Sequence, residues 1–201
     1  MLAVITGDIV HSSKVSPATM QQAHRRIEQV IADFAPRSQC RGELYRGDAL
    51  QIMVPQPHYA PAICIGLIAA LAMEGLQVTL SLAIAPANSA ERVALSQGPA
   101  FTMSGQGLED TPRGGWSVHS SDTDLAEKLS LPSELMGFIL SRLTAKQAEI
   151  LYYWLTHERC EQQQIADAFG MTRQNVSLHW RKAAGPHILR YLQQAEAWSA
   201  Q

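Results

Sequence analysis

Apolar residues recur along the first part of the chain with two periods, one typical of strands and one typical of helices. Residues 2–10 form an almost continuous apolar and β-branched run, which predicts a buried central strand with Asp8 near its end. Helical spacing follows over residues 17–34, after the N-cap candidate Ser16. Pro36 is expected to end this helix.

The next fifty or so residues complete a recognisable order of elements. Residues 44–45 and 50–54 read as two short strands around a turn, 61–73 as an apolar helix, and 78–85 as an alternating fourth strand. The order β-α-β-β-α-β is that of a split βαβ, or ferredoxin-like, sheet. We therefore expect an α+β domain of palm type.

The segment that follows is richer in glycine and then becomes helical. Residues 96–99 are expected to break the chain, 104–107 are interpreted as a helix packed through its glycines or as a close approach to a ligand, and 116–118 as a last strand. Residues 121–140 carry an apolar stripe that Pro132 is expected to break. This helical segment is expected either to pack between two domains or to form part of a dimer seam. No Gly/Ser-rich linker separates the two halves, which favours firm contact between them.

The pattern near the C-terminus predicts two short helices joined by a tight turn. The first ends at Gly170, which adopts left-handed conformations at little cost, and Thr172 is an N-cap candidate for the second. Val176 and Trp180, four residues apart, are expected to face the core. Gly185-Pro186 is expected to stop the second helix. A last helix, 187–198, would serve as a dimerisation element or as the lid of a small core.

The outward face of the second short helix carries side chains that hydrogen-bond base edges and phosphates. This arrangement predicts a helix-turn-helix that places the helix in the major groove of double-stranded DNA. The alternative is an ordinary helical hairpin with a charged outer face. The expected DNA contacts are Arg173, Gln174, Ser177 and Arg181, with Lys182 on phosphate.

Residues upstream of this pair extend the pattern. The run Leu143-Thr144-Ala145-Lys146-Gln147-Ala148-Glu149-Ile150-Leu151 resembles the opening helix of regulators of the LuxR and sigma-factor region 4 type. In that type, a helix of this pattern braces the helix-turn-helix. The resemblance covers residues 143–184 and implies a DNA-binding function.

Composition narrows the possible partners and location. The 201 residues are 46% hydrophobic and carry a formal charge of −2, so DNA contact would rest on a local basic patch. One copy would bind weakly, which favours a homodimer on two half-sites. The three cysteines have neither disulfide nor zinc spacing. The absence of a leader and the shortness of the apolar stretch 60–73 predict a cytoplasmic protein without membrane contact.

Two acids of the first half are expected to converge. Asp8 ends the first strand, and Asp48 lies in the hairpin that a split βαβ sheet places beside it. Converging carboxylates repel unless a cation lies between them, and Mg²⁺ prefers such oxygen ligands together with water and substrate phosphates. Each acid follows a glycine, which would let the backbone approach an anionic group. The alternative is that Asp8 merely ends a strand and Asp48 makes a turn.

Three sequence blocks carry a family resemblance. ITGDIVHSS, YRGDALQ and GPAFTMSGQGLE resemble the SatD family, and their order is similar to that of class III nucleotide cyclases. The resemblance implies that Asp8 and Asp48 hold the metal. It also implies that the segment containing Ile9, Ser12 and Ser13 lies near the triphosphate. The departures are Thr102 in place of the cyclase Asn, Gln106 in place of its transition-state Arg, and Leu44 in place of its purine-reading Lys. Arg46 is a nearby cation that could substitute.

Together these patterns predict a palm-like domain over 1–120, a connecting helical segment over 121–140 and a helix-turn-helix domain over 141–201. The leading hypothesis is a bacterial transcriptional regulator that binds DNA, whose first domain is either a scaffold or a binder of a Mg²⁺-nucleotide effector. No catalytic residue is assigned, because without the Arg the developing charge on phosphate loses its stabiliser. The alternative is a Mg²⁺-dependent nucleotide-processing enzyme with a helical partner-binding appendage. A third interpretation is a structural adaptor.

Overall fold

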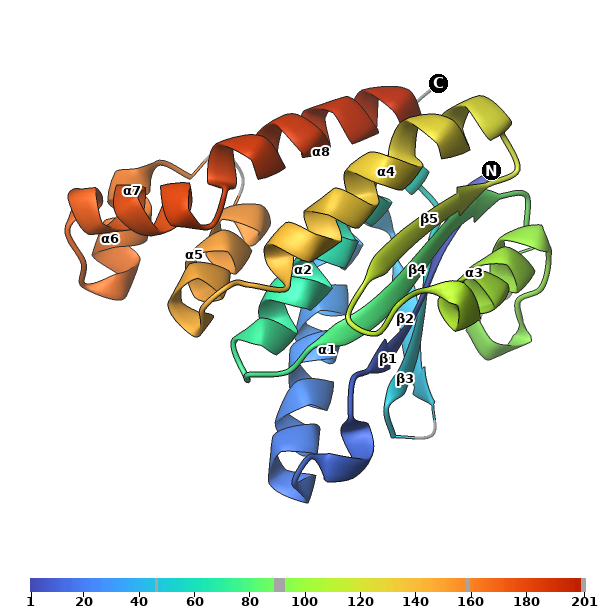
Figure 1. The fold of residues 1–201 in the computed structure, drawn as a ribbon, viewed down its shortest axis with the longest axis horizontal. Coiled ribbons are helices and arrows are strands. Elements are labelled where there is room, and N and C mark those ends of the chain that lie inside the picture. Colours follow the sequence, from blue (N-terminus) through green and yellow to red (C-terminus); the bar gives the residue numbers. More distant parts are fainter. Residues whose placement is uncertain (46, 89–92, 158–159, 200–201) are drawn as a thin grey trace.

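The computed structural model of the chain describes residues 1–45, 47–88, 93–157 and 160–199. Five strands of these residues form one sheet, with helices on both of its faces, and further helices extend away from it (Figure 1). The predicted α+β class is confirmed. The strands are β1 (Leu2–Ile9), β2 (Arg41–Tyr45), β3 (Ala49–Val54), β4 (Val78–Ala85) and β5 (Trp116–Ser120).

The helices alternate with the strands and then dominate the second half of the chain. Short 3-10 turns occur at η1 (Ser12–Lys14), η2 (Pro57–Tyr59) and η3 (Val93–Leu95). The α-helices are α1 (Pro17–Ser38), α2 (Ala60–Ala72), α3 (Pro99–Asp110), α4 (Thr123–Leu140), α5 (Ala145–Thr156), α6 (Gln162–Phe169), α7 (Arg173–Lys182) and α8 (Gly185–Ser199). None of the helices in the described ranges has both the length and the apolar character needed to cross a membrane.

The sheet has the strand order β2-β3-β1-β4-β5. Strand β1 is central and pairs antiparallel with both β3 and β4, while β4 and β5 are parallel. The predicted order β-α-β-β-α-β is therefore present from β1 to β4. In this register Asp8 lies opposite Ala49 on one side and Thr79 on the other, next to the β2–β3 turn.

Helices cover both faces of the sheet. The residues of β1 and β4 are therefore mostly apolar, whichever face they point to. One face packs against α1 and α2 in the main core, which includes Ile5, Ile52 and Leu82. The other face packs against α3 through a smaller cluster that contains Val4 and Met53. This double coverage makes the central strands read as continuous hydrophobic runs.

The C-terminal helices share the main core of the sheet domain. Residues of α5 and α8 join that core, and both helices contact α2. Polar contacts add to this packing. The Tyr152 hydroxyl donates to Asp33 of α1 at 2.7 Å, the Arg37 guanidinium donates to the Leu155 carbonyl at 2.6 Å, and Ser133 and Tyr191 are hydrogen-bonded at 2.7 Å. The firm contact expected between the two halves is confirmed by these contacts.

Three predicted helix breaks differ in the structure. Helix α1 continues through Pro36 to Ser38, and α4 continues through Pro132. Pro36 is exposed in the last turn, where the carbonyl that loses its partner can bond to water. The end of α7 is set by Ala184, at φ 59°, and α8 already begins at Gly185. Pro186 is tolerated there because the first helical turn needs no amide donor.

We predict that Gly185→Ala destabilises the fold by about 1–3 kcal/mol, the usual cost of overfilling a packed site. A Cβ atom at this buried position would lie 2.1 Å from the Trp180 ring, which cannot move as a flexible chain end could. Urea unfolding followed by tryptophan fluorescence measures the change. Gly105→Ala is the matched control, because nothing lies within 4 Å of a Cβ there and alanine favours a helix. Equal stability of the two variants would contradict the assignment.

Candidate functional site

Helices α6 and α7 form the surface for which the sequence predicts DNA contact. Helix α6 ends at Gly170, whose φ of 59° reverses the chain without strain. Thr172 then caps α7, because its hydroxyl accepts a hydrogen bond from the Asn175 amide at 3.2 Å. The predicted turn and cap are both observed. The two helices are thus joined by a three-residue connection, 170–172.

One side of α7 is held against α5 and α6 by a small core. Val176 is fully buried in a cluster with Ile150, Ile165 and Ala166. The half-buried Trp180 ring lies 4.9 Å from the Trp154 ring of α5, centroid to centroid, with the two planes tilted by 52°. The inward orientation expected of Val176 and Trp180 is therefore observed, and it fixes which residues of α7 face solvent.

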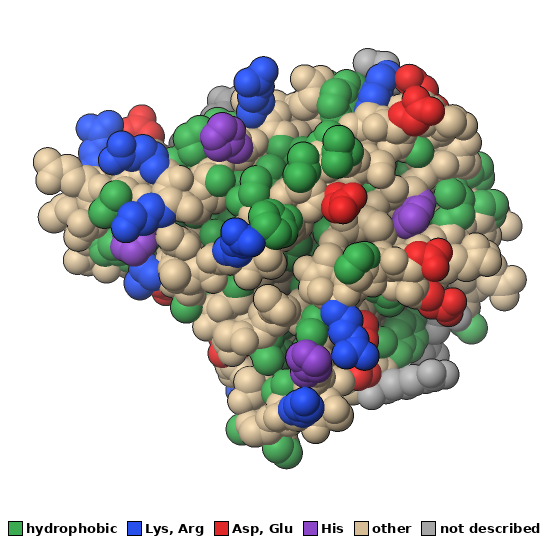
Figure 2. Space-filling view, viewed as in Figure 1, with side chains coloured by type: hydrophobic (Ala, Val, Ile, Leu, Met, Phe, Trp, Pro, Cys, Tyr) green, Lys and Arg blue, Asp and Glu red, His purple; other side chains and the backbone are tan. Residues whose placement is uncertain are grey.

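Most of the predicted contact residues of α7 are open to solvent. Arg173, Gln174, Arg181 and Lys182 are exposed, and Ser177 is half-buried. Arg173, Gln174 and Ser177 also line an open surface hollow of about 560 Å³. Figure 2 shows basic side chains gathered over the end of the molecule that α6 and α7 form. The cationic residues of the last turn also complement the negative end of the helix dipole.

The two aspartates of the first half come together at one end of the sheet. The Ile9 amide, next to Asp8, donates to the Asp48 carbonyl at 3.2 Å, which ties the end of β1 to the β2–β3 turn. Ser12 of η1 donates its hydroxyl to the Asp48 carboxylate at 2.6 Å. Asp8, Asp48 and Ser12 therefore lie around one small area of surface, as the strand order predicted.

The proximity of the two acids affects the proton affinity of Asp8. Burial raises the pKa of the Asp8 carboxyl above its ordinary value of 3.8, and the negative charge of Asp48 raises it further. The backbone amide of Ile9 acts in the opposite direction by hydrogen bonding. The residue as a whole remains exposed, so solvent screens this repulsion and limits its effect on the free energy of unfolding.

The two glycines that precede these acids have local roles. A Cβ atom on Gly7 would lie 2.6 Å from Leu80 and 3.3 Å from Leu50, so this glycine allows close packing within the sheet. Gly47 has a φ of 87°, which the tight turn requires. The sequence interpretation linked both glycines to an approaching anion. The structure shows a packing function for Gly7 and a turn function for Gly47, and the approach of an anion stays a prediction.

The residues expected near a triphosphate are in different situations. The Ile9 side chain is buried and its amide already bonds to Asp48, whereas Ser12 is half-buried and Ser13 exposed on η1. Arg46 lies outside the described residues. His11, which precedes η1, adopts a left-handed conformation at φ 56° and turns the chain after β1.

Sequence reasoning missed one residue that supports this area. The His24 ring on α1 lies 2.6 Å from the Gly47 carbonyl, measured from Nε2, and so helps hold the β2–β3 turn. The sequence pattern assigns no role to this histidine. No spacing rule could have found the contact, because the two residues are 23 positions apart and meet only when α1 packs beside the hairpin.

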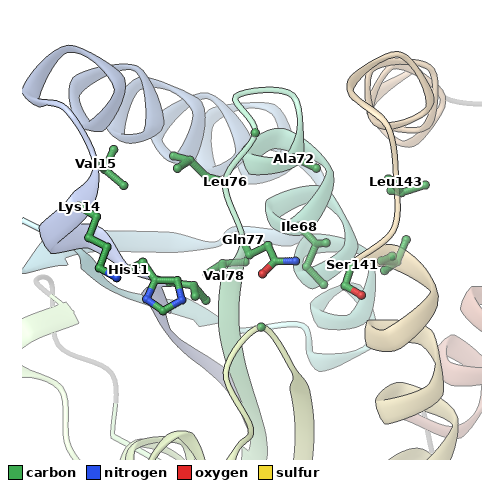
Figure 3. Close-up of a pocket in the computed structure, with 14 residues that line it drawn as sticks. His11, Lys14, Val15, Ile68, Ala72, Leu76, Gln77, Val78, Ser141 and Leu143 are labelled. Atoms are coloured by element: carbon green, nitrogen blue, oxygen red, sulfur yellow. The ribbon is translucent and has the colours of Figure 1, made fainter.

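A pocket of about 390 Å³ lies beside the segment that follows β1. Figure 3 shows His11 and Lys14 on one side of it, Gln77 and Val78 at the start of β4, and Ser141 beyond the end of α4. Its apolar wall comes from several segments, among them Ile68 of α2, Leu76 and Leu140, and neither Asp8 nor Asp48 lines it. The pocket is therefore a neighbour of the paired aspartates and not part of their surface.

The environment of each cysteine disfavours the reactive thiolate. The three cysteines are free; Cys40 and Cys64 are buried, and Cys160 is half-buried. Burial raises the pKa of each cysteine thiol, which keeps it in its less reactive form. Within residues 1–45, 47–88, 93–157 and 160–199, no group of three or more His, Cys, Asp or Glu side chains is arranged to hold a metal ion.

We predict that Asp8→Asn raises the melting temperature at pH 7 by about 1–2 °C, a small change for a chain of this size. Because the folded-state pKa of Asp8 is raised, its ionisation costs stability. This cost is absent below about pH 3.8 and is present in full above the folded-state pKa. The advantage of the variant should therefore shrink as the pH falls toward 4.

Differential scanning calorimetry across this pH range measures the effect. Asp167→Asn removes an exposed acid from α6 and serves as the control for the loss of one negative charge. An equal gain in both variants at pH 7, or a gain for Asp8→Asn that does not change with pH, would contradict repulsion between Asp8 and Asp48.

Comparison with known proteins identifies no family for this chain. No family model matches it, and no curated protein matches it. Among solved structures, it is similar to the crystal structure of the guanylyl cyclase Cya2, with 12% sequence identity and a TM-score of 0.41. The similarity covers 58% of this chain and 73% of that one. At this identity and TM-score, the similarity establishes no activity for the chain described here.

Proposed function

We propose that this chain is a transcriptional regulator that binds double-stranded DNA through α7. The observation that carries the proposal is the two-sided character of this helix. Val176 and Trp180 fix one side of α7 in a packed core, while Gln174 and Arg181 are exposed away from that side and Arg173 is exposed in the first turn of the helix. A recognition helix needs this combination, because base contacts require side chains that are exposed but held in a constant orientation.

The chemistry of the exposed face fits the major groove. Arginine donates two hydrogen bonds to guanine, and glutamine donates and accepts with adenine. Arg173 and Gln174 open α7 at the end next to the turn, where recognition helices make many base contacts. Ser177 and Arg181 follow on the same side, and Lys182 is assigned to phosphate. The resemblance of residues 143–184 to LuxR and sigma-factor region 4 regulators supports the same interpretation.

The charge of the chain makes the location of these residues important. The formal charge is −2, so there is no general attraction between the whole protein and DNA. Affinity would depend on the local cations of α7 and its neighbourhood. Contacts to base edges would then contribute a larger share of the binding free energy than they do in a strongly basic protein. In such a protein most of the binding free energy comes from phosphate contacts, which are independent of sequence.

We predict that Arg173→Ala weakens binding to a selected DNA site by about 1–3 kcal/mol and relaxes the preference at one base position. Sites are first selected from a random duplex pool with the wild-type protein, and affinities are then measured by fluorescence anisotropy at fixed salt. Lys182→Ala should instead weaken binding similarly on all sequences and reduce its salt dependence. Arg25→Ala, which removes an exposed arginine from α1, is the charge-matched control.

A result in which Arg173→Ala, Lys182→Ala and Arg25→Ala all bind every duplex as the wild type does would refute the assignment of α7. A pool that yields no enriched sequence, with uniformly weak and salt-sensitive binding, would refute sequence recognition while leaving general DNA affinity.

A second candidate function is favoured by the convergence of Asp8 and Asp48. The palm-like first domain would bind Mg²⁺ with a nucleotide, as the resemblance to SatD proteins and nucleotide cyclases implies. The donor set fits a partial Mg²⁺ site, because two carboxylates and the neighbouring Ser12 hydroxyl are oxygen donors, and phosphates and water would complete the coordination. The metal would supply charge neutralisation between the carboxylates and the phosphates.

Turnover of the nucleotide is not part of this second proposal. Thr102 and Gln106 are exposed on α3 at the positions that the resemblance assigns to the cyclase Asn and Arg. Neither residue provides the positive charge that stabilises a phosphoryl transition state. The nucleotide is therefore proposed as an effector of the regulator and not as a substrate.

We predict that ATP or GTP together with Mg²⁺ raises the melting temperature of the wild type and that Asp48→Asn abolishes this shift. A nucleotide at about 100 times its dissociation constant would add about 2.7 kcal/mol to stability. Nucleotide with a chelator, and Mg²⁺ alone, separate the two components, and Asp167→Asn controls for the removed charge. Equal shifts in wild type and Asp48→Asn would refute the site, and steady loss of the nucleotide would revive the enzyme alternative.

A further inference from the structure

One face of α4 is apolar and exposed. Leu131, Leu135 and Phe138 have exposed fractions of 59%, 53% and 57%, and they follow one another at intervals of four and three residues. This spacing places them on one side of the helix. The opposite side of α4 is buried against β5 and α8. We call the exposed side, Glu127 to Arg142, the α4 stripe.

The concentration of apolar surface on α4 is unusual for this molecule. The exposed large hydrophobic residues of the described ranges are Met1, Leu95, Leu131, Leu135, Phe138, Leu178 and Leu189. Those on α4 are the ones that form a contiguous row, and Figure 2 shows hydrophobic side chains gathered along the course of this helix. Scattered exposed hydrophobic residues need no explanation, whereas a contiguous row marks a binding surface.

The two ends of the α4 stripe carry opposite charges. Glu127 is exposed one turn before Leu131, and Arg142 is exposed just beyond the end of the helix. The Arg142 guanidinium lies 4.0 Å from the centroid of the Phe138 ring, so it covers one end of the apolar row. The stripe thus has an acid before and a base after its three apolar side chains, and a second exposed acid, Glu134, lies between Leu131 and Leu135 on the same face.

The end charges of two copies of this helix face are complementary when the two helices run antiparallel. In an antiparallel pair of α4 helices, a two-fold axis passing between Glu134 and Leu135 sets Leu131 opposite Phe138 of the second copy. The same axis sets Glu127 opposite Arg142 of the second copy, because both residues lie the same number of positions from it. Complementary charges at the edges of an apolar contact fix register and orientation.

We propose that a second copy of this chain docks on the α4 stripe, with the two α4 helices antiparallel about this axis. The interaction is isologous, so each copy contributes the same apolar row and the same pair of end charges. A partner of different sequence would need its own matching acid and base, whereas a second copy supplies both at the required separation.

The surface beside the stripe can enlarge this contact. A hollow of about 480 Å³ lies beside Leu131 and is lined in part by Met103 and Val118, and another of about 450 Å³ lies beside Phe138. Stable interfaces bury about 800 Å² on each partner, which a single helix face does not provide. Side chains of the second copy entering these hollows would add the remainder. Glu134 lies close to the axis and lines the second hollow together with Arg113, a cation.

The self-association proposed here does not rest on the function proposed for α7. It concerns a different helix, needs no DNA, and is measured on the full chain alone. If Arg173→Ala loses DNA binding but still forms the dimer, the function proposed for α7 is affected and the self-association is not. If the dimer is lost while one copy still binds a half-site, the reverse holds.

Sedimentation velocity of the full chain over about 1–100 µM tests the proposal. We expect a concentration-dependent monomer–dimer equilibrium. Arg142→Glu and Glu127→Arg should each weaken the dimer by about ten-fold or more, because each places like charges opposite one another. The double variant Glu127→Arg with Arg142→Glu should restore the dimer to within about three-fold of the wild type, since the pairing is then re-formed in reverse.

Arg25→Glu is the control for a charge reversal away from the stripe. Melting temperatures of all variants separate loss of folding from loss of association. A wild type that stays monomeric at every concentration overturns the proposal and assigns the stripe to a partner of another sequence. A dimer that is unaffected by both single reversals, or a double variant as weak as the single ones, also overturns it.

Discussion

The structure depends on the burial of α2, which has no polar face. Its thirteen residues contain no charged or hydrogen-bonding side chain, and most of them are fully buried. A helix that is apolar all round must be covered on every side. In this chain α1, the sheet, α5 and α8 surround it. Gly66 allows one of these contacts, because a Cβ atom there would lie only 3.1 Å from the Phe34 ring. The C-terminal helices α5 and α8 thus cover part of the main core around α2.

This requirement explains which features the sequence could predict. Local rules identified the Ser16 and Thr172 caps, the left-handed Gly170 and the continuous apolar run of β1, because each depends on neighbours within a few positions. The approach of Asp8 to Asp48 also followed, since the strand order places the end of β1 beside the hairpin. These are cases in which a short-range pattern and the topology agree.

Other features depend on contacts that periodicity cannot specify. A helical repeat shows that α5 and α8 have apolar faces but not that these faces belong to the core of the sheet domain. The contact of His24 with the Gly47 carbonyl, and the bond between Tyr152 and Asp33, join residues far apart in the chain. The sequence predicts helix breaks at Pro36 and Pro132 because the missing amide is costly inside a helix. In α1 the cost is limited because Pro36 lies in an exposed last turn, whereas α4 continues through Pro132 with packed residues on both sides of it.

Helix α1 gives the two candidate sites a common mechanical element. It is an uninterrupted rod of 22 residues, about 33 Å long at 1.5 Å per residue. It starts a few residues after Ser12, which bonds to Asp48, and its other end is bonded to α5 through Asp33 and Arg37. Helix α5 in turn packs against α7. Helices α1 and α5 thus form a continuous packed connection between the neighbourhood of Asp48 and the support of α7.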